Sequence, residues 1–354
     1  KHPLAGGAEI STHEHAKGWV KAGHTVTIFA SSFPGGKPTE SMDGIHIIRR
    51  GTHYTVHLWA CWYFLKIAPK TIDLVVDEFH FIPFFTPFFV RGKKLAFIHE
   101  TAEEVWFKNT SFPMNLFGYL LEPLFFVLYR HVLFMTVSES TKKDLIKFKI
   151  PEKNIHVIAN GVKQINVSVK KTTYPTVMYL GRISNDKGIL DGLYAFSNIR
   201  RSIKDAVFWV VGKEEHAGQM SILVKTVRDL HLEHSVNFMG FVTEAKKYEL
   251  LHRSWVLLHP SIKEGWGLTV IEAASQGTPT VGYRVSGLID SVVDGKTGLL
   301  SDQGDPDRLA ENIVSLCRDR EMYNRFSIHA QRWSKRFTWT KAVSQSTQLI
   351  ENIV

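Results

Sequence analysis

Short apolar runs alternate with longer helix-compatible stretches through both halves of the chain, and this alternation most constrains the fold. In the first half, residues 25–30, 44–48, 72–77, 94–98, 132–137 and 155–158 have the pattern of strands. In the second half, the strand-like runs are residues 176–180, 207–211, 236–239, 255–259, 280–282 and 298–300. Strands that alternate with helices are typical of βαβ units with parallel sheets. We therefore expect an α/β protein.

The length of 354 residues favours two domains, because a single hydrophobic core rarely grows to that size. Residues 163–175 are polar, lack apolar periodicity and end at Pro175, so they are predicted to be the linker. This division gives an N-terminal domain at 1–162 and a C-terminal domain at 176–336. Residues 337–354 have the apolar spacing of an amphipathic helix.

The segment from Pro260 to Pro279 predicts a loop that runs into a helix. Pro260, Gly265 and Gly267 disfavour regular structure, whereas residues 268–275 are helix-compatible and Gly277 follows as a stop signal. Glu264 then lies in the loop and Glu272 on the helix. Glycines let the backbone approach a ligand closely, and the free N–H groups of a helix start favour an anion. A phosphate group is the natural ligand for such a segment.

The two glutamates seven residues apart belong to an ordered set of motifs that resembles the retaining glycosyltransferases of family 4, which have the GT-B fold. The other motifs are Gly6-Gly7-Ala8-Glu9, Asn160-Gly161-Val162, the run from Gly181 to Gly188, Phe238 to Val242, and Gly277-Thr278-Pro279. The resemblance implies two Rossmann-like parallel-sheet domains that face each other across a cleft. It also implies that residues 337–354 cross back to the N-terminal domain, and that the family's first strand lies upstream of Lys1.

The resemblance further implies a nucleotide-diphospho-sugar donor, most readily a UDP- or GDP-sugar. Arg182 and Lys187 would bind the diphosphate, Glu264 the transferred sugar and Glu272 the ribose. The expected donor-binding set is Gly6, Gly7, Gly181, Arg182, Lys187, Val242, Glu264, Gly265, Trp266, Gly267, Leu268 and Glu272. Trp266 stands where phenylalanine is commoner in the family. Whether Glu264 acts as a nucleophile or the leaving diphosphate deprotonates the acceptor stays open.

The expected catalytic residues are His99, Arg182, Lys187 and Glu264. His99 ends an apolar strand and resembles the family's histidine at the cleft, where it would bind the donor sugar. Glu100, Glu103 and Glu104 have the pattern of a solvated helix start. No cofactor and no metal site are expected, because the sequence has no histidine and carboxylate cluster with ligand spacing. Arg182 and Lys187 would supply the counter-charge instead.

The chain has a net charge of +9, spread almost evenly over both halves. Nucleic-acid binding usually requires a clustered basic stripe and a recognisable module, and the sequence shows neither. Residues 107–135 are rich in aromatic residues and leucine, with Lys108, Arg130 and His131 interspersed. This pattern fits either an interfacial segment for an anionic membrane surface or a core helix with one solvent face.

The predicted partners are therefore a nucleotide-sugar donor, a glycan or lipid-linked acceptor, and an anionic membrane surface. The two widely spaced cysteines, Cys61 and Cys317, favour reduced thiols and a cytoplasmic location, with peripheral attachment to the inner membrane face as the alternative. Two other functions stay open. The chain could be a sugar-nucleotide epimerase of the same fold or a catalytically inactive glycan-binding homologue.

Overall fold

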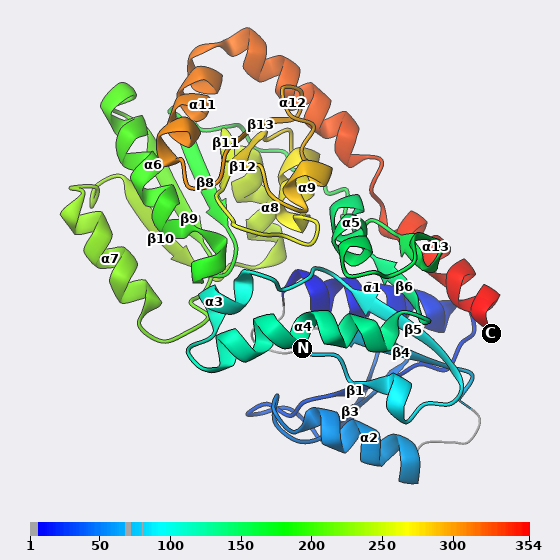
Figure 1. The fold of residues 1–354 in the computed structure, drawn as a ribbon. Coiled ribbons are helices and arrows are strands. Elements are labelled where there is room, and N and C mark those ends of the chain that lie inside the picture. Colours follow the sequence, from blue (N-terminus) through cyan, green and yellow to red (C-terminus); the bar gives the residue numbers. More distant parts are fainter. Residues whose placement is uncertain (1–5, 68–71, 80) are drawn as a thin grey trace. The chain divides into compact units, whose positions relative to one another are not determined.

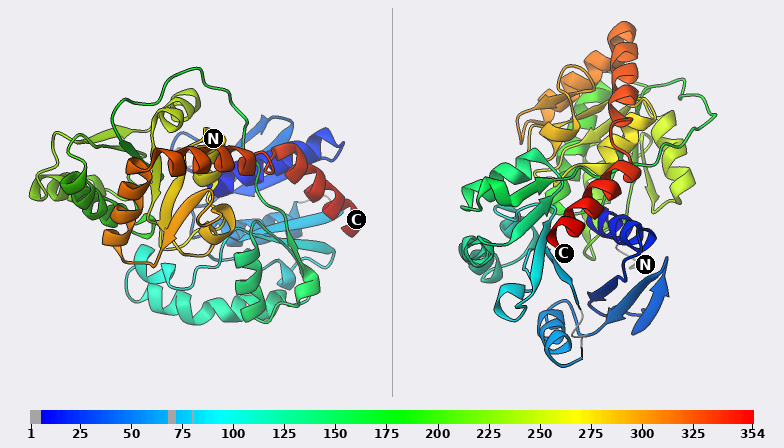
Figure 2. Two further views of the ribbon diagram at one scale, coloured as in Figure 1. Left: turned by 90° about the horizontal axis from the view of Figure 1, so that it is seen from above. Right: turned by 90° about the vertical axis from the view of Figure 1, so that its right-hand side faces the viewer.

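The computed structural model describes residues 6–67, 72–79 and 81–354, and Figures 1 and 2 show its ribbon. The chain divides into two compact units. The first comprises the described residues of Lys1–Trp106, Phe112–Gly161 and Trp339–Val354, and the second comprises Phe107–Ser111 and Val162–Thr338. Each unit has the α/β architecture expected from the sequence.

The first unit contains a parallel four-stranded sheet in the order β4-β5-β6-β7. Its strands are β4 (Leu74–Phe79), β5 (Lys93–Ile98), β6 (Leu133–Thr136) and β7 (Ile155–Val157). Strand β5 is largely buried between its neighbours, as an apolar run in a parallel sheet should be. Side chains of Phe79, Phe126, Tyr129 and Phe134 pack into the core beneath this sheet.

A second sheet of the first unit differs from the prediction. Its order is β1 (Thr27–Ala30), β3 (Ile45–Arg49) and β2 (Thr39–Met42), and β2 pairs antiparallel with β3. The expectation of parallel pairing throughout is wrong here. Asp43 and Gly44 connect the two strands with φ values of +53° and +82°. An Asp-Gly pair with positive φ at both residues forms a tight hairpin turn, and that turn brings in a strand that alternation alone does not predict.

The helices of the first unit include α1 (Gly7–Lys21), α2 (Val56–Lys66), α4 (Met114–Tyr129), α5 (Glu139–Lys147) and α13 (Trp339–Ile353), and α3 (Val105–Asn109) runs from this unit into the second. Helix α13 packs against α1, and the two lie side by side in the views of Figures 1 and 2. His15 Nδ1 lies 2.8 Å from Ser346 Oγ, and the Trp19 indole donates to the same hydroxyl at 3.0 Å. A Cβ on Gly18 would lie 2.1 Å from a methyl group of Val343, so this glycine permits the close approach of the two helices.

The second unit is built on a parallel six-stranded sheet in the order β10-β9-β8-β11-β12-β13. Its strands are β8 (Thr176–Leu180), β9 (Val207–Val211), β10 (Val236–Gly240), β11 (Val256–His259), β12 (Thr280–Tyr283) and β13 (Gly298–Ser301). Its helices are α6 (Ile189–Ser202), α7 (Gln219–Asp229), α8 (Glu244–Arg253), α9 (Leu268–Ser275), α10 (Leu288–Ser291), α11 (Pro306–Arg318) and α12 (Arg320–Ser334). The central strands are fully buried and carry one continuous hydrophobic core.

The segment predicted to be a linker, residues 163–175, has neither helix nor strand. It is nevertheless held to the second unit. Lys171 Nζ donates to the carbonyls of His252 and Ser254 at 3.0 and 2.8 Å, and the Trp255 indole donates to the carbonyl of Thr172 at 3.0 Å. These bonds satisfy backbone groups that a polar segment would otherwise leave to water.

Candidate functional site

The strand order of the second unit creates a switch point between β8 and β11. The chain runs outward from β8 to β9 and β10, and then continues on the other side of β8 with β11, β12 and β13. The loops that follow β8 and β11 therefore leave neighbouring strands toward opposite sides of the sheet. Ligands of open α/β sheets bind at this position, outside the carboxyl ends of the strands. Arg182 and Lys187 follow β8, and Glu264 follows β11.

Lys187 and Glu264 form an ion pair across the switch point. Lys187 lies in a 3-10 turn, Asn185–Lys187, and its Nζ is 2.8 Å from Glu264 Oε1. His259, the last residue of β11, places its Nε2 3.1 Å from the same oxygen. Burial raises the pKa of Glu264, but the Lys187 charge and the His259 hydrogen bond outweigh that effect and hold it below its ordinary value. Glu264 is therefore an ionised carboxylate, and its Oε1 accepts hydrogen bonds from both Lys187 and His259.

Two glycines allow these loops to pack closely against each other. Gly188 has φ +64°, and a Cβ there would lie 1.9 Å from the carbonyl oxygen of Pro260. Gly287 has φ +79°, and its Cβ would lie 2.2 Å from the carbonyl oxygen of Glu264. A side chain at either position would push the loop after β11 away from its neighbours. The ion pair of Lys187 with Glu264 depends on this close backbone packing.

Helix α9 begins directly after the loop and spans Leu268–Ser275, the range predicted from the sequence. Its N-cap is Gly267, with φ +82°, which has no side chain that could cap the helix. Gly265 and Leu268 flank this turn, so the backbone of the helix start is not covered by a capping side chain. A helix start of this kind favours a negatively charged group.

Trp266 does not extend outward from the loop. Its side chain is buried, and its ring packs edge-on against Phe337 with centroids 4.9 Å apart. Its indole nitrogen has no hydrogen-bond partner among the described residues. Trp266 therefore supports the loop from beneath, and only its backbone is expected to meet a ligand.

Glu272 is paired differently from Glu264. It lies on α9, and its Oε1 accepts from Lys247 Nζ of α8 at 2.5 Å. Burial raises the pKa of Glu272 and the Lys247 charge offsets this only in part, so the net shift is upward. The hydroxyl of Tyr248 also bonds to Glu272, and its own pKa is raised by burial and by this carboxylate. Glu272 is thus bonded to Lys247 and Tyr248, and its contact with a ribose stays a prediction.

Arg182 is paired with Glu215, which follows β9. Its Nη1 lies 2.5 Å from Glu215 Oε1. Gly181 stands directly before it and donates its N–H to the carbonyl of Val211 at 3.1 Å. Val242 follows β10 and is half-buried against the core of the unit. A diphosphate bound by Arg182 would therefore have to compete with the carboxylate of Glu215.

In the first unit, Gly6 and Gly7 lie at the start of α1 and His99 lies just after β5. Gly6 is the N-cap of α1, and its N–H donates to Glu9 Oε2 at 2.7 Å, while Gly7 opens the helix. His99 follows β5, and its Nε2 lies 3.2 Å from Glu78 Oε1. The hydroxyl of Thr12 on α1 donates to the same oxygen. The structure thus links α1 and the end of β5 through one carboxylate at the end of β4.

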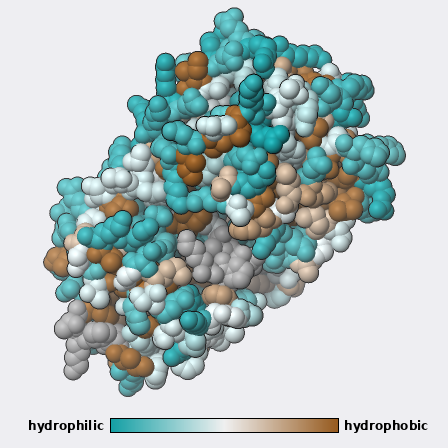
Figure 3. All heavy atoms as spheres, turned by 180° about the vertical axis from the view of Figure 1, so that it is seen from behind, coloured by the Kyte–Doolittle hydropathy of each residue, from teal (hydrophilic) through white to brown (hydrophobic). Residues whose placement is uncertain are grey.

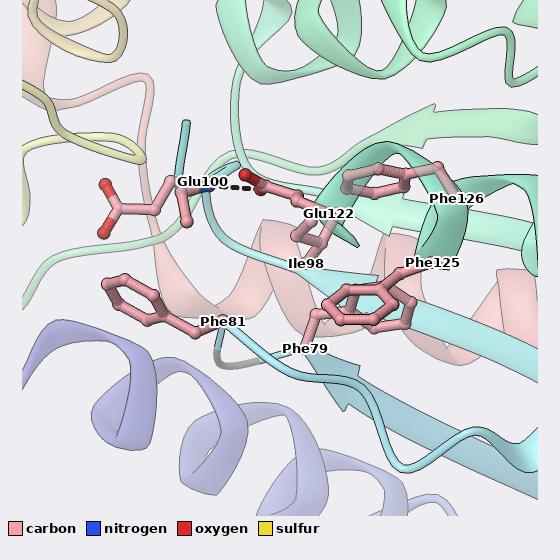
Figure 4. A pocket seen from close by; sticks show the side chains of 8 residues that line it. Phe79, Phe81, Ile98, Glu100, Glu122, Phe125 and Phe126 are labelled. Atoms are coloured by element: carbon pink, nitrogen blue, oxygen red, sulfur yellow. Dashed lines mark hydrogen bonds between the residues drawn. The ribbon is translucent and has the colours of Figure 1, made fainter. Parts of the chain in front are cut away.

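A neighbouring carboxylate, Glu122, has a structural role. It projects from α4 toward the loop after β5 and accepts from the backbone N–H groups of Ala102 and Glu103 at 2.6 and 2.7 Å. Trp106 donates to it at 3.2 Å. Figure 4 shows Glu122 pointing into a small pocket between Phe79, Phe81, Phe125 and Phe126. Since this loop is fixed by Glu122, helix α3 begins only at Val105, after the acidic run at Glu100, Glu103 and Glu104.

Within the described ranges, no group of three or more histidine, cysteine or acidic residues is placed to hold a metal ion. The charged groups at the switch point are instead matched as ion pairs. Four of the residues that make these contacts were not predicted from the sequence: His259, Lys247, Glu215 and Glu78. His259 is the last residue of a predicted strand, next to the loop that carries Glu264, and this position in the sequence could have indicated its role. The other three lie in helix α8, in the loop after β9 and in strand β4, and their neighbours depend on strand order.

Two family models together match nearly the whole chain. The model described as Glycosyltransferase Family 4 matches residues 5–164, and the model described as Glycosyl transferases group 1 matches residues 162–333. The chain belongs to this glycosyltransferase family. The sequence prediction of the family is thereby confirmed.

Curated relatives of this glycosyltransferase chain are less than 30% identical to it over the aligned residues. Glycogen synthase of Mycobacterium tuberculosis is 28% identical over 200 residues, which are 55% of this chain and 48% of the relative. N-acetyl-alpha-D-glucosaminyl L-malate synthase of Bacillus anthracis is 27% identical over 221 residues, which are 59% of this chain and 56% of the relative. The chain thus spans about half the length of these curated relatives.

Solved structures confirm the GT-B fold. Sucrose-phosphate synthase from Thermosynechococcus elongatus has a TM-score of 0.81 at 17% identity and covers 99% of this chain and 94% of its own. HepE of Anabaena, in complex with UDP-glucose, has a TM-score of 0.78 at 17% identity, with 99% and 98% covered. WaaG, a glycosyltransferase involved in lipopolysaccharide biosynthesis, has a TM-score of 0.78 at 16% identity, with 99% and 97% covered.

Proposed function

We propose that this chain is a retaining glycosyltransferase that needs no metal ion. It moves a sugar from a nucleotide-diphospho-sugar, with UDP- and GDP-sugars as the first candidates, to a hydroxyl group of a glycan or lipid-linked acceptor. The observation that carries the proposal is the set of cations and carboxylates at the switch point between β8 and β11. The related fold of HepE, which binds UDP-glucose, supports the donor class.

In the proposed reaction, charge grows on the diphosphate as its bond to the sugar breaks. Arg182 and Lys187 stabilise that charge, and the amides at the start of α9 add to it. Glu264 binds the transferred sugar and Glu272 the ribose hydroxyls. Arg182 and Lys187 replace the divalent cation that other transferases use. Transfer should therefore persist in excess chelator, and abolition by chelator with rescue by magnesium or manganese would contradict this assignment.

The donor is identified by incubating the chain with a panel of UDP-, GDP- and ADP-sugars. A sugar nucleotide that binds the native state raises the melting temperature, because binding to the folded state alone stabilises it. Slow release of nucleoside diphosphate from the stabilising compound supports a transferase. Interconversion of the sugar would identify an epimerase, and stabilisation by a free glycan without any turnover would identify an inactive binding protein.

The acceptor side of the proposal includes an anionic membrane surface, because α4 exposes an apolar face. Its inward stripe is Gly118, Glu122, Phe126 and Tyr129. The exposed side chains are Met114, Leu116, Phe117, Tyr119, Leu120, Leu121, Leu124, Val127 and Leu128. If the outer face of α4 were in contact with water alone, charged and polar residues would be expected at those positions. The alternative of an ordinary core helix does not account for this apolar exterior.

The charges around this face suit an anionic bilayer. Between Glu104 and Glu139 the sequence has one acidic residue, Glu122, and it is buried. Lys108, Arg130 and His131 flank the helix. Helix α2 repeats the pattern with exposed Leu58, Trp59, Trp62 and Leu65, in a segment without acidic residues from 44 to 72. Interfacial helices combine apolar and aromatic faces with basic flanks.

No described helix combines the length and hydrophobicity needed to cross a bilayer. On the face of the molecule in Figure 3, hydrophilic side chains predominate and hydrophobic ones are scattered. The apolar exteriors of α2 and α4 are therefore proposed to lie on the membrane surface rather than to span it. Such a surface would bring the chain to a lipid-linked acceptor.

A further inference from the structure

Two donors hold the same oxygen of Glu264. Lys187 Nζ lies 2.8 Å from Oε1, and His259 Nε2 lies 3.1 Å from Oε1. Neither bond uses Oε2. A carboxylate oxygen with two such donors has little capacity left, whereas Oε2 keeps its lone pairs for another partner. The geometry therefore divides the carboxylate into a fixed oxygen and an available one.

His259 has a defined tautomer at this position. A carboxylate only accepts hydrogen bonds, so Nε2 must carry the proton that His259 donates to Glu264. The side chain is 6% exposed, and Nδ1 is buried without a hydrogen-bond partner among the described residues. An apolar side chain would avoid that unpaired nitrogen. The contact that gives His259 a polar role is the one from Nε2 to Glu264.

We propose that His259 is a positioning residue that, together with Lys187, fixes Oε1 of Glu264 and leaves Oε2 to accept a hydrogen bond from a hydroxyl group of the transferred sugar. This inference rests on the proposed function and names a residue that the predicted site does not contain. Lys187 must also face the diphosphate, and a charge shared between two partners holds each less firmly. His259 is the second donor, and it stays on Glu264 when the diphosphate is bound.

The test compares His259→Gln with His259→Met. Glutamine places an amide N–H at about the reach of Nε2, whereas methionine has a similar length and no donor. Release of nucleoside diphosphate is measured over a range of donor concentrations. In His259→Met, kcat should fall about tenfold or more, the usual scale for losing a hydrogen bond to a charged group, while KM for the donor changes less. His259→Gln should recover most of that loss.

Equal activity of His259→Met and the wild type would overturn the proposal, and so would equal impairment of the two variants. The urea midpoint of each variant checks that folding is retained. If His259→Met does not fold, the titration below is carried out on His259→Gln and on His259→Asn, whose shorter amide cannot reach Glu264.

A second measurement does not depend on turnover. Carboxyl NMR of the wild type and the variants reports the titration of Glu264, and Glu264→Gln identifies its signal. Loss of the His259 donor in His259→Met should raise the pKa of Glu264 toward its ordinary value. An unchanged titration would refute the positioning role even if transfer is observed. Absence of transfer with every nucleotide-sugar would refute the proposed function, while the titration would still report on the bond.

Discussion

The two glutamates of the candidate site in the second unit and Glu122 of the first unit are held in different ways. In the second unit, Glu264 and Glu272 are each paired with a lysine from another element. In the first unit, Glu122 is buried by backbone and indole N–H groups, and His15 is packed as a neutral ring beside Ser346. A carboxylate saturated by backbone and indole N–H groups of a neighbouring loop and helix has a structural role. A carboxylate paired with a lysine side chain marks a place where a ligand can exchange with that pair.

The same contrast separates the surfaces. Exposed apolar side chains of the first unit gather along α4 and α2, which expose no acidic side chain. Those of the second unit, such as Ile222, Phe241 and Ile328, are distributed over separate elements. The even division of net charge between the two halves of the sequence conceals this difference. We therefore expect donor chemistry to depend on the second unit and surface attachment on the first.

The largest expected effect is on transfer in the second unit. Arg182→Ala and Lys187→Ala should each reduce turnover about a hundredfold or more, because they remove cations that stabilise the growing charge on the diphosphate. Lys187→Ala also leaves Glu264 buried without its ammonium partner. Steady-state release of nucleoside diphosphate measures the effect. Lys225→Ala, an exposed lysine of α7, is the matched control, and unchanged turnover in both site variants would reject the diphosphate assignment.

Acid should weaken the first unit through His15. Burial, aided by nearby His99 and opposed by Glu78, lowers the pKa of His15 to about 4. The folded state then binds fewer protons than the unfolded state between about pH 4 and 6.5, so stability is lost as the pH falls through this window. From pH 7 to 5, the free energy of unfolding should fall by about 2 kcal/mol through this group.

Urea unfolding of the wild type and of His15→Asn at both pH values measures this contribution. Asparagine keeps a polar group near Ser346 but does not titrate. The change in unfolding free energy between the two pH values is compared for the two proteins, and the difference is the contribution of His15 apart from the other histidines. An identical pH dependence in both proteins would show that the contact between α1 and α13 tolerates a charged ring. The contrast with the ion pairs of the second unit would then be lost.

Glu272 should affect donor binding more than chemistry. Its predicted contacts with ribose hydroxyls are similar in the ground state and the transition state, so their loss acts on affinity. Glu272→Ala should weaken donor binding about tenfold with little change in turnover at saturating donor. Calorimetric titration and saturation kinetics separate the two quantities. Glu249→Ala, on the surface of α8, serves as the control, and a pure turnover defect would contradict the ribose assignment.

The smallest effect is expected at the apolar face of the first unit. Leu124 on α4 is 57% exposed, and Leu124→Glu should weaken binding to anionic phospholipid vesicles about fivefold. Donor binding should be unchanged. Ile222→Glu on α7 is the matched control, because Ile222 is 55% exposed. Equal vesicle binding by both variants and the wild type would show that α4 does not contact the membrane.

Much of the local structure follows from the sequence because it depends on neighbouring residues. Helix α9 begins after Gly267 and ends at Ser275 as predicted, and strands β8 and β9 have the predicted bounds. The hairpin of β2 and β3 also has a local cause, since the Asp43-Gly44 pair favours a tight turn by itself. It was missed because alternation of strands and helices was taken to imply parallel pairing throughout.

The partners at the site could not be predicted from spacing alone. Glu264 and Glu272 are seven residues apart in one segment, yet Lys187 and His259 bind the first and Lys247 binds the second. The sequence determined which residues carry charge and which lie at the ends of strands. The order β10-β9-β8-β11-β12-β13 decided which of those ends meet, because hydrogen bonding between strands joins segments that no local pattern relates. The direction of each pKa shift was decided in the same way, since burial and charge are properties of the packed chain.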